Sequence, residues 1–342
     1  MEGPHRPKGR SEAHNRILPI ADKVSALTAW RCVMRLTVLT LCAVNTSLSV
    51  PLGDSSSIPV AMFAPPADVP DTVNSVDGVS DSSEINTTRL AIIGGTLAVG
   101  VTTIHVYQAN GWWKYNAAAF HFQEDLTYGL WVDKLGHFYA ANVLTFVLSR
   151  SLQWANFSER SSLWWGFAGS ALFQTYVEVE DGFHTWGFDR VDFAFDIAGA
   201  FYPLAQHYVP ALQVFNFKFS YHASDLLNNP GGVGFRGQKH LMMDDYEGQT
   251  IWLSFRMNNI LPSSVEPYWP DWLCLAVGYG ARDVATPDPY PVVFLALDYD
   301  VSRIIPDHTS FLKLLGEALN FIHFPAPAVR ITPSAIWYGF YF

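Results

Sequence analysis

The chain has 342 residues and a formal net charge of −10, with 49% hydrophobic, 15% aromatic and only 15% charged residues. An average soluble domain has about a quarter of its residues charged, so this composition favours a protein with large apolar surfaces, as at membranes. The negative charge repels a phosphate backbone, and no stripe of Lys and Arg offsets it, which excludes nucleic acid as an expected partner. Membrane or other envelope components are the partners we expect, and the length leaves room for a leader and two folded parts.

The first 50 residues are interpreted as a signal or leader segment. From Met34 the chain has one positive residue, Arg35, followed by a short apolar run and then by small and polar residues ahead of Val50. This order is typical of a secretory signal, and the run is too short to cross a bilayer. We therefore expect an exported protein of the bacterial cell envelope, periplasmic and membrane-associated. Cys42 is either a lipid attachment site or part of a leader cleaved near Ser49, and both interpretations stay open.

Residues 51–88 are interpreted as a linker. The segment is rich in Ser, Asp, Pro and Val and has no apolar period, as in the run Asp54-Ser55-Ser56-Ser57. Such a sequence cannot bury enough surface to offset the entropy lost on ordering. We expect a disordered tether between the leader and the folded body.

Residues 89–227 are predicted to fold as four apolar helices. The stretches are 90–107, 133–154, 161–179 and 189 to about 210, separated by turn-forming residues. Asp133, Ser161 and Asp189 are the expected N-caps, because Asp and Ser side chains accept hydrogen bonds from the free amides of a first helical turn. The predicted fold is therefore mainly α: a four-helix bundle followed by a smaller strand-rich α+β region.

Polar side chains on three of these helices fall into stripes, because residues three and four positions apart share a helix face. The remaining faces are dense in Trp, Phe, Leu and Ala. Since an unpaired buried charge is costly, the stripes are expected to face one another and form one buried seam. The seam residues predicted in this way are Asp133, Lys134, His137, Glu178, Asp181, Asp192, Asp196 and Gly199.

These residues carry a resemblance. The phrase Asp133-Lys134-Leu135-Gly136-His137-Phe138, then Glu178, then the segment from Asp192 to Gly199 resemble a motif of VanZ-like proteins. The chain is still more similar, over about residues 90–342, to the uncharacterised family of predicted periplasmic lipoproteins that includes YfiM. Asp196 stands where the VanZ-like pattern has Asn. The resemblance implies a helical envelope protein but no assigned activity, so whether the chain is an enzyme stays open.

Two functions of the seam are compatible with its residue types. In the first, His137, Glu178, Asp181 and Asp192 hold a divalent metal, since imidazole and carboxylate suit Mn, Fe or Zn, and His137, Glu178 and Asp192 are the candidate catalytic residues of an envelope hydrolase. In the second, the seam is structural: polar contacts fix the register of the helices in a scaffold or binding protein. No other cofactor is expected.

Whether the helices span a bilayer also stays open. Each apolar run is near the lower length limit for a span, and two of them carry ionisable groups that are costly in lipid. Tryptophans at the helix ends, such as Trp131 and Trp154, are typical of a membrane interface as well as of a protein core.

Residues 228–342 change to the alternating period of strands. Residues 250–257, 274–281 and 293–301 are predicted strands, 311–321 a short helix, and 336–342 an aromatic final strand. About five strands are readable, which is too few for a complete membrane barrel. Asp298 and Asp300 share one strand face, where they are expected to be solvated or to bind a cation.

Overall fold

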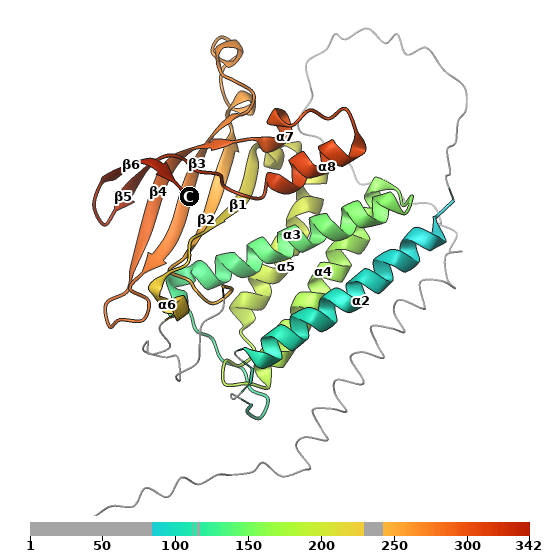
Figure 1. Ribbon diagram of the computed structural model, residues 1–342, viewed down its shortest axis with the longest axis vertical. Helices are drawn as coiled ribbons and strands as arrows, with labels where there is room; N and C mark the ends of the chain where they lie inside the picture. Colours follow the sequence, from blue (N-terminus) through green and yellow to red (C-terminus); the bar gives the residue numbers. More distant parts are fainter. Residues whose placement is uncertain (1–83, 112, 115–116, 229–241) are drawn as a thin grey trace, which may run out of the picture. The chain divides into compact units, whose positions relative to one another are not determined.

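A computed structural model describes residues 84–342 except 112, 115–116 and 229–241. Helices come first and a six-stranded antiparallel sheet follows, so the prediction of a helical fold with a strand-rich C-terminal region is confirmed at this level (Figure 1). The predicted leader, nearly all of the predicted linker and Cys42 lie outside the described residues. Val79–Phe342 clusters as one compact unit, and the description below concerns this unit.

Four long helices make up the first part of this unit. They are α2 (Thr87–Asn110), α3 (Val132–Trp154), α4 (Glu159–Gly182) and α5 (Arg190–Tyr208), with a short 3₁₀ turn at Pro210–Val214 after α5. Asp189 caps α5 as predicted, accepting hydrogen bonds from the amides of Val191 and Asp192. Two predicted caps were wrong. Ser158, not Ser161, caps α4, and α3 starts after Trp131, which places Asp133 inside the first turn with its carboxylate available for other contacts.

Helices α3, α4 and α5 contact one another closely because small residues lie at the crossings. A Cβ added at Gly199 of α5 would lie 2.1 Å from the carbonyl oxygen of Phe138 in α3, and one at Gly166 of α4 would lie 2.9 Å from the carbonyl oxygen of Thr145 in α3. Only a residue without a side chain allows backbones to approach this far. The close approach brings the polar stripes of the three helices within contact distance.

Helix α2 differs from the other three in its exposure. It is the one helix in the described part of the chain that is long and apolar enough to cross a membrane, with a mean hydropathy of 1.6 over its most apolar window, of which 6% is buried. At its start, the amide of Asn86 donates to the carbonyl of Ala155, and Arg89 donates to the carbonyl of Trp154. The start of α2 is thus held against the end of α3.

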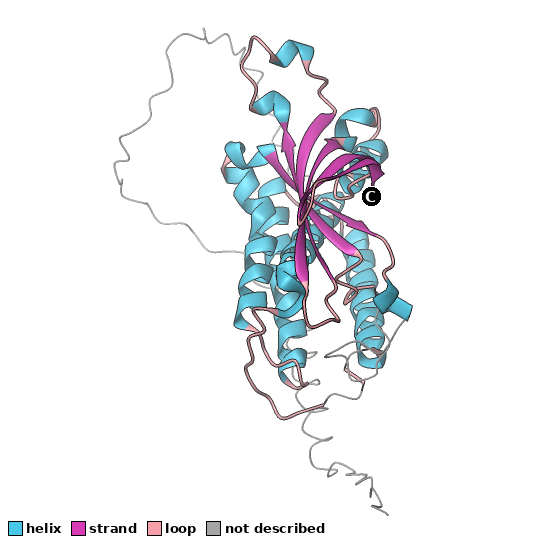
Figure 2. Cartoon of the chain, turned by 90° about the vertical axis from the view of Figure 1, so that its left-hand side faces the viewer, coloured by secondary structure: helices cyan, strands magenta, loops and turns pink. Residues whose placement is uncertain are grey.

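The sheet has its strands in sequence order, and each strand is antiparallel to the next. Strand β1 (Phe215–Tyr221) lies inside the range 89–227 that was predicted to be helical, so that part of the prediction was wrong. The short helix α8 (Ser310–Leu319) coincides with the predicted one. The remaining elements are a 3₁₀ turn before α3 (Tyr128–Trp131), α6 (Asp225–Asn228), β2 (Gln249–Arg256), β3 (Leu273–Arg282), β4 (Tyr290–Tyr299), α7 (Val301–Ile304), β5 (Ala326–Thr332) and β6 (Ile336–Tyr341), with two more 3₁₀ turns between β2 and β3 (Figure 2).

Strand β1 joins the sheet to the helices. Its alternation places Phe217 and Phe219 on the face toward α3, where their rings lie 4.5 Å from Phe138 and 5.4 Å from Tyr139. Lys218 is on the opposite face, together with its cross-strand partner Trp252, which belongs to the buried core of the sheet. The alternation of β1 therefore separates an aromatic contact with α3 from the interior of the sheet.

The expectation that Asp298 and Asp300 are solvated was wrong, because both are buried. Asp298 lies 2.7 Å from the Lys218 ammonium and 3.0 Å from His323 Nδ1, and Asp300 accepts a hydrogen bond from Arg256. Although burial opposes the charge, the hydrogen bond from His323 and the Lys218 ammonium together lower the pKa of Asp298 below its usual value. Asp298 is thus an internal ion-pair partner.

Candidate functional site: a buried acid and histidine centre

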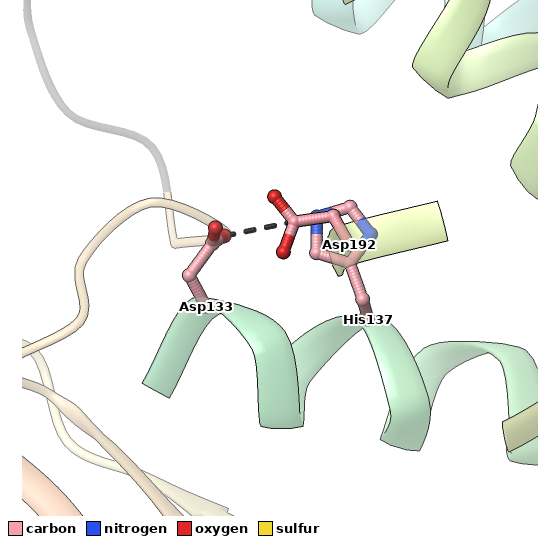
Figure 3. Close-up of side chains that lie close together, drawn as sticks. All are labelled: Asp133, His137 and Asp192. Atoms are coloured by element: carbon pink, nitrogen blue, oxygen red, sulfur yellow. Dashed lines mark ion pairs between the residues drawn. The ribbon is translucent and has the colours of Figure 1, made fainter. Parts of the chain in front are cut away.

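The predicted seam is formed where the start of α3, the end of α4 and the start of α5 meet. His137 extends from α3, Glu178 from α4, and Asp192 and Asp196 from α5, and the last three are buried. Figure 3 shows Asp133 and His137 one turn apart on α3, on the same side as Asp192. The antiparallel course of neighbouring helices thus brings residues up to about sixty positions apart into one cluster.

The two ring nitrogens of His137 face different carboxylates. Nδ1 lies 3.1 Å from Asp196 Oδ1 and 3.7 Å from Glu178 Oε1, whereas Nε2 lies 3.7 Å from Asp133 Oδ1. Burial opposes a charged imidazole, but the carboxylates of Asp196 and Asp133 outweigh it and raise the pKa of His137 well above its usual value. Gln174 fixes Asp196 in turn by donating to the same Oδ1 at 2.6 Å.

Lys134 supplies the permanent positive charge of the centre, and its side chain is fully buried. Its ammonium contacts the carboxylate of Asp125 and lies 3.1 Å from Asp133 and from Asp192 and 3.5 Å from Asp189. Burial works against the ammonium, but these carboxylates raise its pKa above the usual value. A lysine held by four carboxylates stays charged inside the protein.

Carboxylates outnumber cations in this centre. Burial raises the pKa of Glu178 to about 9 and that of Asp192 to about 8, since neither carboxylate is fully compensated by Lys134 and His137. In the described structure Asp192 Oδ1 and Asp196 Oδ2 are buried without a hydrogen-bond partner. Asp192 Oδ1 is still within ion-pair distance of Lys134, so Asp196 Oδ2 is the clearer unmatched atom. The six acids of the centre are Asp125, Asp133, Glu178, Asp189, Asp192 and Asp196.

Three groups of side chains in the described residues have ligand atoms within 4.8 Å of one another, close enough to hold a metal ion. The group Asp125, Asp189 and Asp192 already surrounds the Lys134 ammonium. The group His137, Glu178 and Asp196 uses the His137 nitrogen that is hydrogen-bonded to Asp196. In the third group, Asp133, His137 and Asp192, both acids also contact Lys134, but His137 Nε2 has no hydrogen bond in the described structure, so this group is the candidate cation site (Figure 3).

A residue from the C-terminal half completes this site. The Tyr246 hydroxyl donates to Asp133 Oδ1 at 2.6 Å, and its ring meets Tyr128 edge to face. Burial and the Asp133 charge raise the pKa of Tyr246, so the hydroxyl stays protonated and remains a donor. Sequence reasoning missed Tyr246 and Asp125 because both lie outside the helices, where no period indicates which way a side chain points.

Asp181 lies outside the three groups. Its Oδ1 accepts a hydrogen bond from the Trp113 indole at 2.6 Å, and the Trp113 ring stacks on His184. Asp181 therefore links the end of α4 to the segment that follows α2, although its charge still contributes to raising the pKa of Glu178.

The comparisons with known proteins bear on this same stretch of chain. Residues 121–205 match a family described as predicted periplasmic lipoprotein (DUF2279). The match includes every residue of the centre named above except Tyr246. It is shorter than the range 90–342 of the resemblance described from the sequence. The family description agrees with the predicted localisation, an exported protein of the cell envelope. No curated protein and no solved structure matched the chain.

Proposed function

We propose that this protein is a metal-binding protein of the cell envelope, in which Asp133, His137 Nε2 and Asp192 hold one divalent cation. The observation that carries the proposal is the excess of buried carboxylates over buried cations around a single histidine. Buried charges are normally paired, but in the described structure Asp196 Oδ2 has no hydrogen-bond partner, and Asp192 Oδ1 has only the Lys134 ammonium nearby. A divalent cation at this point would supply the missing positive charge.

The surrounding residues fit the roles that a cation site requires. One imidazole and two carboxylates suit Mn, Fe or Zn. Asp196 accepts from His137 Nδ1, which would keep the proton on that nitrogen and present Nε2 to the ion. Tyr246 orients Asp133, and Lys134 holds Asp192 at the same time. A bound cation would supply a Lewis acid and an activated water, which is the chemistry of an envelope hydrolase.

A second candidate function is a scaffold in which the seam serves only helix register. The contacts of Lys134 with three acids favour this function. Asp125 lies in the loop before α3, Asp133 at the start of α3 and Asp192 at the start of α5, so these contacts link the three segments without any metal. The VanZ-like bundle and the envelope partners expected from the sequence belong to this proposal. In it, the same residues determine how the helices pack and do not bind an ion.

Metal analysis separates the two functions. We expect the purified full chain, incubated with Mn²⁺ or Zn²⁺ and desalted, to retain about one ion per molecule and to melt at a higher temperature than after chelation, because a ligand that binds only the folded state stabilises it. His137→Ala and Asp192→Asn should lose the ion and the thermal shift while remaining folded. His207→Ala, at the far end of α5, is the matched histidine control and should retain both.

The opposite pattern would support the scaffold. If the wild-type chain retains no ion and its melting temperature does not respond to either metal, the cation proposal is wrong. Unfolding of His137→Ala under metal-free conditions in which the wild type stays folded would then assign the seam to helix register.

A further inference from the structure

Strands β3 to β6 present an apolar row on the outer face of the sheet. Val277 pairs with Leu295, Leu295 with Val329, and Val329 with Trp337, and directly paired residues of antiparallel strands share a face. Val277, Leu295 and Trp337 are 36%, 49% and 65% exposed. The next pair on the same face, Leu275 and Leu297, continues the row. Exposed apolar surface that is continuous across four strands marks a contact site.

The two faces of the sheet differ in what they bury and what they expose. The face opposite this row contains the buried polar side chains, including Lys218, Asp298 and Ser254, together with the core residues Trp252 and Phe294. Helix α3 covers the outer face at β1 and β2, where Phe217 and Phe219 meet its aromatic side chains. Nothing described covers the middle of the outer face on β4 and β6, where Leu295 and Trp337 are exposed.

The outer face of β3 and β4 carries no charged side chain along its full length. The five register pairs on it run from Leu273 with Tyr299 to Ala281 with Pro291. Ala281, at the far end of β3, is buried against Val132, so the exposed part of this face is centred on Leu275, Val277 and Leu295. Trp272 and Tyr268, which are 41% and 87% exposed, lie just ahead of β3, as interfacial aromatic residues do.

We propose that this outer face, centred on Val277, Leu295 and Trp337, docks on the acyl layer of a phospholipid membrane. Protein interfaces carry polar groups and hydrogen bonds among their apolar contacts, whereas the exposed centre of this face, at Leu275, Val277 and Leu295, is purely apolar. A second copy could pair with the free edge of β6, but edge pairing extends a sheet and leaves its faces uncovered. Acyl chains match a face that carries no charged side chain and whose exposed centre is apolar.

A local fluorescent probe tests the proposal, because other segments of the chain could bind vesicles by themselves. In the full chain with Cys32→Ser and Cys42→Ser, bimane is attached at Leu295→Cys, while the buried Cys274 stays unlabelled. We expect vesicles of phosphatidylethanolamine and phosphatidylglycerol to shift the emission to the blue and nitroxide-labelled acyl chains to quench it. The control label at Thr286→Cys, in the exposed turn between β3 and β4, should show neither effect.

A double variant gives a second readout. Leu295→Gln with Trp337→Ser should lower vesicle partitioning by about tenfold or more, since two large apolar side chains no longer enter the membrane. Both residues are exposed, so circular dichroism and the melting temperature should stay unchanged. The proposal is overturned if vesicles do not change the emission of bimane at position 295. It is also overturned if the emission shifts with protein concentration without vesicles, because that would indicate contact with a second copy.

Discussion

Replacing Lys134 by methionine is expected to destabilise the protein by about 3–5 kcal/mol, the usual effect of removing one partner from a buried ion pair. Four carboxylates lie around the Lys134 ammonium, and its side chain is fully buried, so no water can replace the lost charge. Urea unfolding in the presence of a chelator measures the change. The matched control is Lys313→Met on α8, where the lysine is exposed and the free energy of unfolding should change little.

The same experiment identifies the cause of the loss. Adding Asp125→Asn to Lys134→Met removes one of the uncompensated carboxylates and should restore part of the lost stability, because the two side chains are in direct contact. If the effects of the two substitutions are additive, the Lys134 ammonium does not balance the Asp125 charge. The same conclusion follows if the Lys134→Met chain is as stable as the Lys313→Met control.

Gly199→Ala is expected to lower the free energy of unfolding by about 3 kcal/mol, at the upper end of the effects of overpacking. The new methyl group would lie 2.1 Å from the Phe138 carbonyl oxygen and 2.7 Å from its Cα, which are backbone atoms that cannot rotate away. Helices α3 and α5 would have to separate. Because His137 adjoins Phe138 and Asp196 lies on the same face of α5 as Gly199, the centre would open as well and metal affinity should fall.

Gly95→Ala provides the matched comparison for a glycine inside a helix. An added Cβ at Gly95 in α2 meets nothing within 4 Å, so this substitution should stabilise the protein by about 0.5–1 kcal/mol through helix propensity alone. Thermal and urea unfolding of both variants give the comparison. Equal effects of the two substitutions would mean that α3 and α5 are not in backbone contact at Gly199.

The helices, and the contact between their polar faces, could be predicted because the helical period determines which residues share a face. Asp192, Asp196 and Gly199 were placed together on that ground, and all three are buried against α3 and α4. The seam could be predicted because an acid that is buried without a partner costs free energy, so buried acids are expected to face one another and a cation. The sequence period does not give interatomic distances, so it could not predict which acid contacts each nitrogen of His137.

Residues outside the helices were harder to place. Asp125 and Tyr246 reach the centre through loops, and their positions depend on long-range contacts with Lys134 and Asp133. Strand β1 was missed although Phe215 to Tyr221 alternates aromatic and polar residues, because the range was assigned to the helical part. The burial of Asp298 depends on Lys218 from β1, so missing that strand also hid the partner of this acid.

The most direct test of the cation proposal is anomalous diffraction from crystals of the full chain grown with Mn²⁺. We expect one strong anomalous peak within about 2.3 Å of Asp133, His137 Nε2 and Asp192, as for first-row metals with nitrogen and oxygen ligands. The peak should be absent from crystals of Asp192→Asn. A wild-type map without a peak at these residues, or with the only peak at Asp181, would contradict it.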